Sequence, residues 1–247
     1  MSKRKFLTAE WRNLVMINYE VDAEVLKPYL PAATEIDLWQ GKALVSMVGF
    51  LFNNTRVLGI KWPLHVNFEE VNLRFYVRHF DGSVWKRGAV FISEIVSKSI
   101  IAVIANTLYK EHYSAMPTRH SISKQGAHHT SFLYEWKFGD KWNKLGATIR
   151  NSLKNIEEGS PEEFIFEHYW GYNSLGAHKT KQYQVEHIRW QVAEVTDYVF
   201  EADVAGLYGK DFEPYLTTKP YSVFFANGSP ISVRIGDNLQ LAPTPLK

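Results

Sequence analysis

The sequence has no cysteine among its 247 residues. This absence excludes disulfide bonds, thiolate metal sites and cysteine nucleophiles together, and it fits a reducing compartment. No apolar run approaches the roughly 18 residues that a membrane-spanning helix needs. The N-terminus is basic, but Trp11, Arg12 and Asn13 soon interrupt any apolar stretch of the signal-peptide kind. We therefore expect a soluble, cytoplasmic protein that does not enter a membrane.

An excess of charge of one sign is also missing. The formal net charge is only +2, and the basic residues are dispersed along the chain. Nucleic acid is therefore not an expected partner, because recognition of a phosphate backbone needs clustered Lys and Arg. The sequence has neither a glycine-rich phosphate loop nor a Gly-x-Ser-x-Gly elbow, so nucleotide binding and serine hydrolysis lack support. No cofactor is predicted.

Aromatic residues are abundant, at 15% of the chain. This density favours a β-rich architecture, in which large flat side chains pack on pleated faces. Strand patterns occupy residues 14–19, 34–39, 43–52, 70–79, 87–96, 131–138, 182–191, 198–204, 221–226 and 231–235. Residues 34–39 and 43–52 read as a hairpin around the turn at Gln40 and Gly41.

Three short segments are predicted to be helical. Asp22 is a candidate N-cap, and Ser160 followed by Pro161 is a good helix start. Residues 99–109 suit a buried helix or a strand, and we prefer the helix. The polar stretch at residues 151–159 is too short for a linker. We expect one domain over residues 1–247, mostly β with a few short helices, built on a curved or closed sheet.

The strand at residues 70–79 carries the first candidate site. Its alternation places Glu70, Asn72 and Arg74 on one face and apolar residues on the other. A buried face with a carboxylate, an amide and a guanidinium is costly unless these groups satisfy one another or a ligand. The plainer interpretation is a solvated face with weak cross-strand pairing.

Two Glu-His pairs form the second candidate site, at Glu167-His168 and Glu186-His187. Neither is spaced as a zinc motif, and no third ligand stands out, so no metal is predicted. A hydrogen-bonded histidine oriented by its adjacent carboxylate is the favoured interpretation. Lys110 is a third candidate, as a Schiff-base nucleophile. A surface lysine is the better reading, because Glu111 would raise its pKa rather than lower it.

Several segments resemble the uncharacterised bacterial DUF2071 or YqjF-like family, including residues 6–14, 67–74, 90–95, 167–172, 185–187 and 224–229. That family is placed with acetoacetate decarboxylase by fold. The resemblance implies a partly open β-barrel around a central small-molecule pocket. It also leaves room for a homo-oligomer, by analogy with oligomeric relatives.

This chain differs from acetoacetate decarboxylases at the residues that carry out decarboxylation in that family. Where acetoacetate decarboxylases have Tyr-Arg-Thr-Asp, this chain has Tyr-Glu-Val-Asp at residues 19–22, so Glu20 replaces the arginine. The Tyr-x-Glu motif corresponds to residues 68–70, which implies that Glu70 is the retained pocket glutamate. The lysine pair of that family aligns with Tyr113 and Ser114, and a slip of three residues would promote Lys110. Imine chemistry needs an amine nucleophile, so we expect it to be absent.

The sequence thus predicts a protein that binds a small apolar or aromatic organic ligand, such as a carboxylate. Whether it is an enzyme is left open. The predicted catalytic residues are Glu70 and His168, and the predicted ligand-binding residues are Arg74, Tyr113, Trp170 and His187. The alternative is a lyase or hydratase acting on a small keto or hydroxy acid, with Glu70 as acid/base or Lys110 as nucleophile. A purely structural module is the remaining rival.

Overall fold

The computed structural model describes residues 4–62, 66–97 and 113–240. All fourteen described strands join one hydrogen-bonded sheet, and the helical segments are short. The strands are β1 (Lys5–Val21), β2 (Glu35–Ile36), β3 (Ala43–Val57), β4 (Phe68–Phe80), β5 (Trp85–Val96), β6 (Tyr113–Ala115), β7 (Thr118–Gln125), β8 (His129–Phe138), β9 (Lys141–Asn155), β10 (Trp170–Ser174), β11 (Lys179–His187), β12 (Gln191–Glu201), β13 (Ser222–Arg234) and β14 (Asp237–Gln240). The helical segments are η1 (Ala23–Tyr29), α2 (Pro161–Phe166), α3 (Val204–Tyr208) and α4 (Glu213–Leu216).

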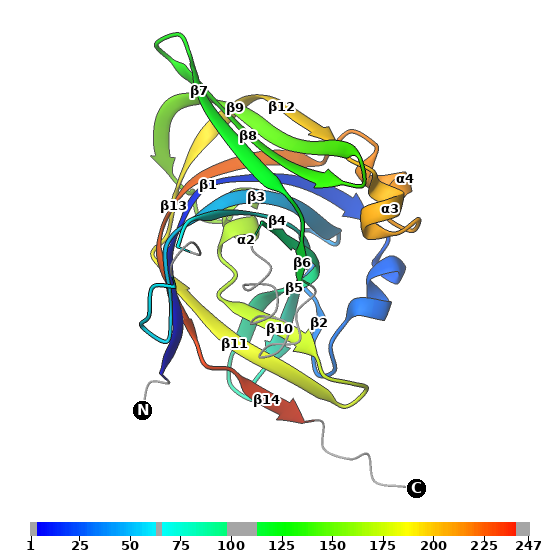
Figure 1. The fold of residues 1–247 in the computed structure, drawn as a ribbon. Helices are drawn as coiled ribbons and strands as arrows, with labels where there is room; N and C mark the ends of the chain where they lie inside the picture. Colours follow the sequence, from blue (N-terminus) through cyan, green and yellow to red (C-terminus); the bar gives the residue numbers. More distant parts are fainter. Residues whose placement is uncertain (1–3, 63–65, 98–112, 241–247) are drawn as a thin grey trace, which may run out of the picture.

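Seven strands close into a ring. Its order is β5-β4-β3-β1-β13-β11-β10, and β10 returns to β5. Two seams are thin: β10 meets β5 at only two residue pairs, and β11 meets β13 at three. The long pairings are antiparallel and lie between β1, β3, β4, β5 and β13. The result is a partly open ring, and α2 lies within its outline (Figure 1).

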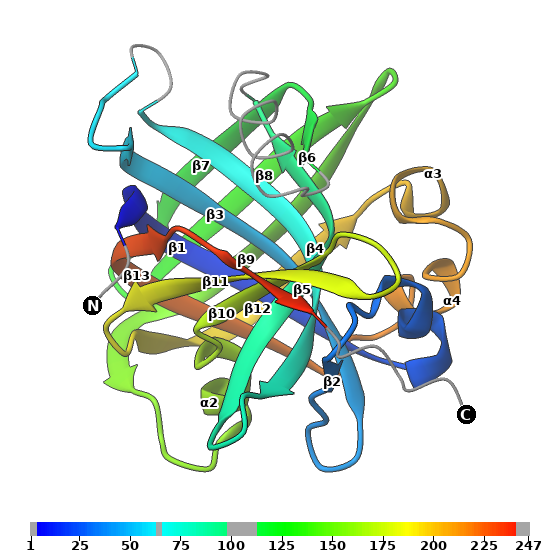
Figure 2. The same cartoon turned by 90° about the horizontal axis from the view of Figure 1, so that it is seen from below.

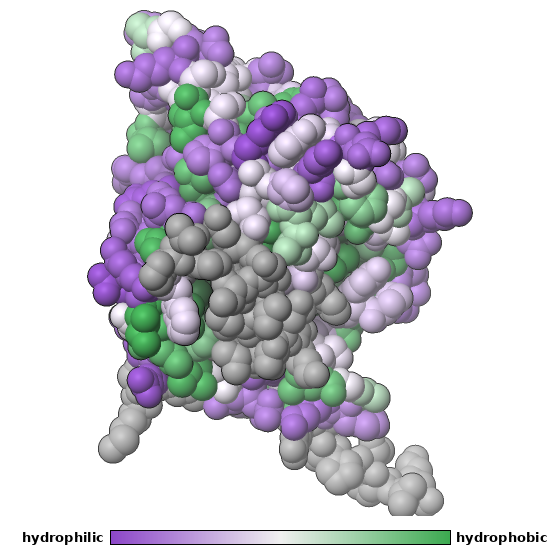
Figure 3. Space-filling model, viewed as in Figure 1, coloured by the Kyte–Doolittle hydropathy of each residue, from purple (hydrophilic) through white to green (hydrophobic). Residues whose placement is uncertain are grey.

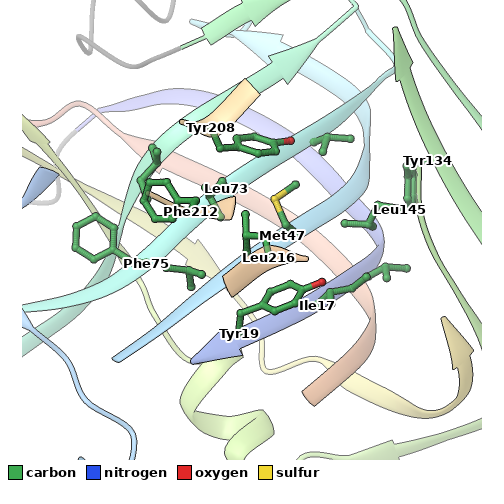
Figure 4. Packing of buried hydrophobic residues seen from close by; sticks show 14 of the residues in the cluster. Ile17, Tyr19, Met47, Leu73, Phe75, Tyr134, Leu145, Tyr208, Phe212 and Leu216 are labelled. Atoms are coloured by element: carbon green, nitrogen blue, oxygen red, sulfur yellow. The ribbon is translucent and has the colours of Figure 1, made fainter. Parts of the chain in front are cut away.

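A second layer covers the outside of this ring. Strands β12, β9, β8 and β7 continue the sheet from β13, and they pack over β1 and β3 (Figure 1). The core between the layers, called here the outer core, includes Ile17, Met47, Leu73, Tyr134 and Leu145 (Figure 4). Tyr208 of α3, Leu216 of α4 and Phe212, which caps the start of α4, add to it. Seen from below, the two helices and η1 group at one side of the molecule (Figure 2).

The other face of β1, β3 and β4 looks into the ring, and we call it the ring interior. It packs against the apolar side chains of α2, which include Phe164 and Phe166. Helix α2 begins as predicted: the Ser160 side chain accepts a hydrogen bond from the amide of Glu163, and Pro161 opens the first turn. Central strands of the ring are therefore covered on both faces.

Most predicted strands are confirmed, and the alternation of β4 is as expected. The predicted hairpin at residues 34–39 and 43–52 is wrong in its pairing. Its turn forms, with Gln40 and Gly41 at positive φ, but β2 pairs with β4 instead of β3. Residues 151–155 complete β9, so the polar stretch is in part a strand. The segment at 99–109 lies outside the described residues. No helix in the described ranges is long and apolar enough to cross a bilayer.

Gly49 of β3 tests the contact between the two layers. A Cβ atom there would lie 2.7 Å from Tyr134 Cδ2 and 2.9 Å from Leu145 Cδ2, and both residues are buried. We expect Gly49→Ala to lower the free energy of unfolding by about 1–3 kcal/mol, because the second layer must shift. Urea unfolding measures this loss. Ser123→Ala on exposed β7 is the control, and an equal loss in both variants would contradict the assignment.

Candidate functional site

The ring-interior face of β4 carries a row of buried polar side chains. Glu70 and Asn72 are each 2% exposed, and Arg74 follows them on the same face. The intervening residues Val71 and Leu73 belong to the outer core. Asn72 Nδ2 donates a hydrogen bond of 2.9 Å to Glu70 Oε1, while Asn72 Oδ1 has no partner in the described part of the chain. The predicted polar face is thus buried rather than solvated.

Tyr113 completes this row from a different strand. It opens β6, which pairs with β5 beside Glu94. Its hydroxyl donates a hydrogen bond of 3.0 Å to Glu70 Oε2. The structure therefore brings together Glu70 and Tyr113, two of the residues that the sequence assigned to one site. Glu70 accepts from an amide and a phenol, so both of its oxygens are oriented by neutral donors.

Arg74 has an unusual environment for a half-buried cation. Its Nη2 lies 3.5 Å from the sulfur of Met16, and its guanidinium lies 5.5 Å from the ring centre of Tyr76. Its buried Nε has no hydrogen-bond partner, and no carboxylate of the described residues forms an ion pair with it. Burying a charged donor without a partner is costly. Among the described residues, Arg74 is therefore a cation of the ring interior whose Nε has no acceptor and whose Nη2 has only the weak acceptor Met16 Sδ.

His168 is anchored by a carboxylate that the sequence did not reveal. Its Nε2 lies 3.2 Å from Asp37 Oδ2, and Arg87 Nε donates to the same oxygen at 2.6 Å. The prediction that Glu167 orients His168 is wrong, because Glu167 instead accepts a hydrogen bond from the Tyr169 hydroxyl. With Nε2 donating to Asp37, the buried Nδ1 is a lone-pair acceptor, and it has no partner among the described residues.

Burial dominates the protonation of His168. It lowers the pKa to about 4, the Asp37 carboxylate opposes this shift, and the charges of Arg87 and Arg74 add to it. His168 is therefore neutral at pH 7. Its ring lies 4.6 Å from that of Tyr76, whose hydroxyl is 2.5 Å from Ser46 Oγ. This arrangement fixes the ring orientation of His168 at the Arg74 end of the row.

His187 is bonded differently from His168. Its Nδ1 donates to the carbonyl of Ile188 at 2.8 Å, and its ring stacks on Trp190 at 4.2 Å. The predicted partner Glu186 points away and binds Arg234, because successive residues of a strand face opposite ways. Burial lowers the pKa of His187, and the charge of Arg74 contributes in the same direction.

Aromatic side chains line the interior near Glu70, and sequence analysis had not assigned them to the site. Trp11 makes edge contacts with Phe50, Phe52 and Trp190 at 5.4–6.2 Å between ring centroids. Phe50 pairs directly with Glu70 across β3 and β4. The indole Nε1 of Trp11 is buried without a partner in the described residues. Trp11 lies in residues 6–14, which carry the family resemblance. That resemblance was the signal in the sequence that could have pointed to Trp11 as a site residue.

Trp170 is placed elsewhere. Its ring packs on the outer core with Lys86 Nζ 4.7 Å above it, so the structure does not bring it beside Arg74.

A groove of about 230 Å³ lies apart from the ring interior, on the second layer, and is lined by residues such as Ser131, Thr148 and Asp197. Lys110 falls outside the described residues.

The substitution at Glu20 is visible in the structure. Its carboxylate forms an ion pair with Lys42, and both side chains are substantially exposed. No group of three metal-ligating side chains occurs in residues 4–62, 66–97 and 113–240. Among the described residues, the ring interior offers a cation without an ion pair, a hydrogen-bonded carboxylate and an aromatic wall.

Comparisons with solved structures define the class of fold. Acetoacetate decarboxylase from Legionella pneumophila matches with a TM-score of 0.63 at 12% identity, over 95% of this chain and 87% of that one. The enduracididine biosynthesis enzyme MppR complexed with pyruvate matches at 0.66 and 11%, over 96% and 91%. An acetoacetate decarboxylase-like enzyme from Sphingomonas wittichii RW1 matches at 0.64 and 11%, over 97% and 95%. The fold is that of the acetoacetate decarboxylase-like proteins.

The family is narrower than the fold. A family model described as "Uncharacterized conserved protein" matches residues 8–230, and the chain belongs to this family, DUF2071. Uncharacterized protein YqjF of Bacillus subtilis (strain 168) is 31% identical over 70 residues. That match spans 28% of this chain and 29% of the relative's length.

The buried His168 makes the stability of the protein depend on pH. Its lowered pKa means that the neutral form stabilises the fold above pH 6.5, and that this contribution is lost as the pH falls from 6.5 toward 4. We expect His168→Gln, which keeps a donor for Asp37, to reduce the loss of unfolding free energy between pH 7 and pH 5 by about 2 kcal/mol. Urea titrations at both pH values measure this. His178→Gln, at an exposed histidine, is the control. Identical pH slopes for wild type and His168→Gln would contradict the assignment.

Proposed function

We propose that the ring interior binds a small organic acid whose carboxylate sits on Arg74. The observation that carries this proposal is the guanidinium of Arg74, held inside the ring with an unpartnered Nε and no ion pair among the described residues. A carboxylate accepts two parallel N–H bonds from such a fork and neutralises its charge. A bound acid therefore supplies what the described protein groups leave unsatisfied.

Further unpaired atoms extend the same argument. In the described part of the chain, the buried polar atoms without a partner include several in or beside the ring interior: Trp11 Nε1, Asn72 Oδ1, Arg74 Nε, Glu167 Oε1 and His168 Nδ1. Native proteins leave few such atoms, and each asks for an explanation. Similar atoms occur elsewhere in the described residues, at Thr55 and Trp136 for example, but those on Asn72 and Arg74 share one strand face with Glu70, which supports a polar ligand there. Bound water is the competing explanation for any single one of them.

The body of the ligand is suggested by the wall around Glu70. Trp11, Phe50 and Phe52 offer ring faces and edges in contact with one another. Such surfaces pack against apolar or aromatic groups, with polar atoms setting the orientation. We infer an acid that carries an apolar or aromatic portion directed toward Trp11, with its carboxylate at the opposite, Arg74 end of the row.

The fold neighbours support an organic acid in general terms. One of them, MppR, is a structure complexed with pyruvate, which is itself a small carboxylate. At 11% identity the likeness concerns the fold, so the ligand of this chain rests on its own residues.

Decarboxylation through an imine is not part of the proposal. Glu20 occupies the position where the resemblance expects an arginine, and it pairs with Lys42. Tyr113 occupies an expected lysine position and bonds Glu70. A lyase or hydratase with Glu70 as acid/base is the second candidate, favoured by the two hydrogen bonds that orient this buried carboxylate. Proton transfer by Glu70 would need the ligand to approach between Tyr113 and Asn72.

The first test replaces Arg74. We expect Arg74→Met to weaken the binding of small carboxylates by about 10- to 100-fold, since a hydrogen bond to a charged group contributes about 1.5–3 kcal/mol. Without ligand, Arg74→Met should be as stable as wild type or more stable, because it removes an unpaired buried charge. Calorimetric titration with 2-oxo acids and aryl carboxylates, together with thermal unfolding, measures both effects.

Arg78→Met provides the matched control on the same strand. Arg78 is already paired with Glu35 and stacks on Trp85, so its loss should leave binding unchanged. Equal affinity of wild type and Arg74→Met for every acid that binds would refute the role of Arg74. A large loss of stability in ligand-free Arg74→Met would show instead that the guanidinium serves the fold.

A second test concerns imine chemistry. We expect borohydride reduction in the presence of acetoacetate or pyruvate to leave the mass of the intact protein unchanged, because Tyr113 stands where the nucleophilic lysine is expected. Mass spectrometry of the intact protein reads out the result. An adduct that disappears in Lys110→Ala would establish Lys110 as a nucleophile and replace the binding proposal by the lyase alternative. Lys124→Ala on exposed β7 is the control for random surface reduction.

A further inference from the structure

An exposed turn follows β3. We call residues 57–62 the tip. Val57 and Ile60 exchange two backbone hydrogen bonds of 3.0 Å around the two-residue turn Leu58-Gly59. Both turn residues have positive φ, 51° at Leu58 and 86° at Gly59. Asn or Gly is the usual first residue of such a turn, and a leucine there is strained. The sequence thus keeps a large apolar side chain at a position that disfavours it.

The tip exposes apolar side chains at alternate positions. Leu58 is 47% exposed, Ile60 is 57% exposed and Trp62 is 44% exposed. Isolated exposed apolar residues are ordinary, but three at one tip form a patch that invites a partner. In the view of Figure 3, apolar residues gather at the lower left, where Figure 1 draws the turn after β3 close to the start of β1.

Basic side chains surround this patch. Arg56 and Lys61 flank the turn and are exposed. The amide of Leu58 donates to the carbonyl of Phe6 at 2.7 Å, which places the exposed Arg4 and Lys5 at the same end of the ring. None of these four cations forms an ion pair within the described part of the chain.

The acidic residues at this end are hydrogen-bonded to other groups, although the charge of Lys5 also helps to lower the pKa of Glu186. Glu10 is bonded to Arg12 and Asn54, and Glu186 is bonded to Arg234 and Ser232. Asp237, which begins β14, also has a partner. The tip therefore presents apolar side chains together with unpaired positive charge.

We propose that this tip docks on an anionic lipid surface. Leu58, Ile60 and Trp62 enter the headgroup boundary, where Trp is favoured, and Arg4, Lys5, Arg56 and Lys61 meet lipid phosphates. Charge complementarity decides the occupant. A second copy of the chain docking by the same patch would bring eight cations together, whereas an anionic membrane neutralises them. The contact is peripheral and requires no spanning segment.

The test measures co-sedimentation with vesicles of phosphatidylcholine alone or with about a quarter phosphatidylglycerol, in low and high salt. Wild type should bind the anionic vesicles and lose most of this binding in high salt. A variant with Leu58→Asn, Ile60→Ser and Trp62→Gln should bind at least about tenfold more weakly. Its fold should persist, because Asn suits the turn better than Leu. Arg56→Gln with Lys61→Gln should weaken binding to anionic vesicles only.

The β4–β5 hairpin offers a matched control. Phe80, Val84 and Trp85 are as exposed as the tip residues, but the neighbouring Lys86 is paired with Asp81. Replacing these three apolar residues by Ser, Ser and Gln should leave vesicle binding unchanged. The proposal is overturned if wild type does not bind anionic vesicles, or if both triple variants bind as wild type does. It is also overturned if the tip variant instead abolishes a dimer seen by light scattering, which would assign the patch to a second copy.

Discussion

The organisation of this protein depends on the burial of both faces of β4. One face of the strand packs under the second layer through Val71, Leu73 and Phe75, and the other face looks into the ring. A strand covered on both sides normally reads as a continuous apolar run. Here every second residue from Glu70 to Arg74 is polar, so the ring interior must satisfy these groups by itself or through a ligand. Glu70 accepts hydrogen bonds from its neighbours, whereas the Nε of Arg74 has no partner in the part of the chain that the structure describes.

Much of this arrangement could be predicted from the sequence. The period-two pattern of residues 70–79 indicated the shared face of Glu70 and Arg74, because strand alternation is a local property. Tyr113 was assigned to the site through the family resemblance, and its hydroxyl donates a hydrogen bond to Glu70. The N-cap at Ser160 followed from residue types alone.

Other features depend on contacts between distant parts of the chain. Asp37 and His168 are 131 residues apart, and nothing near either residue announces the other. Sequence proximity suggested Glu167 and Glu186 as histidine partners, and both assignments were wrong because neighbouring side chains diverge. The pairing of β2 with β4 was missed for a similar reason, since a good turn at Gln40 and Gly41 does not determine which strand is the partner. Trp170 faces the outer core for reasons of register that its local sequence does not contain.

The central claim concerns the guanidinium of Arg74, and arginine side-chain NMR tests it most directly. The 15N–1H signal of Arg74 Nε, assigned with Arg74→Met, would be followed during titration with 2-oxo and aryl carboxylates. The account predicts that at least one acid shifts this signal saturably and slows its exchange with water, while the Arg78 signal stays in place. Specific small ligands mostly bind with dissociation constants below about 10 mM. If no acid moves the Arg74 signal at concentrations up to about 10 mM, the ring interior is not an acid-binding site.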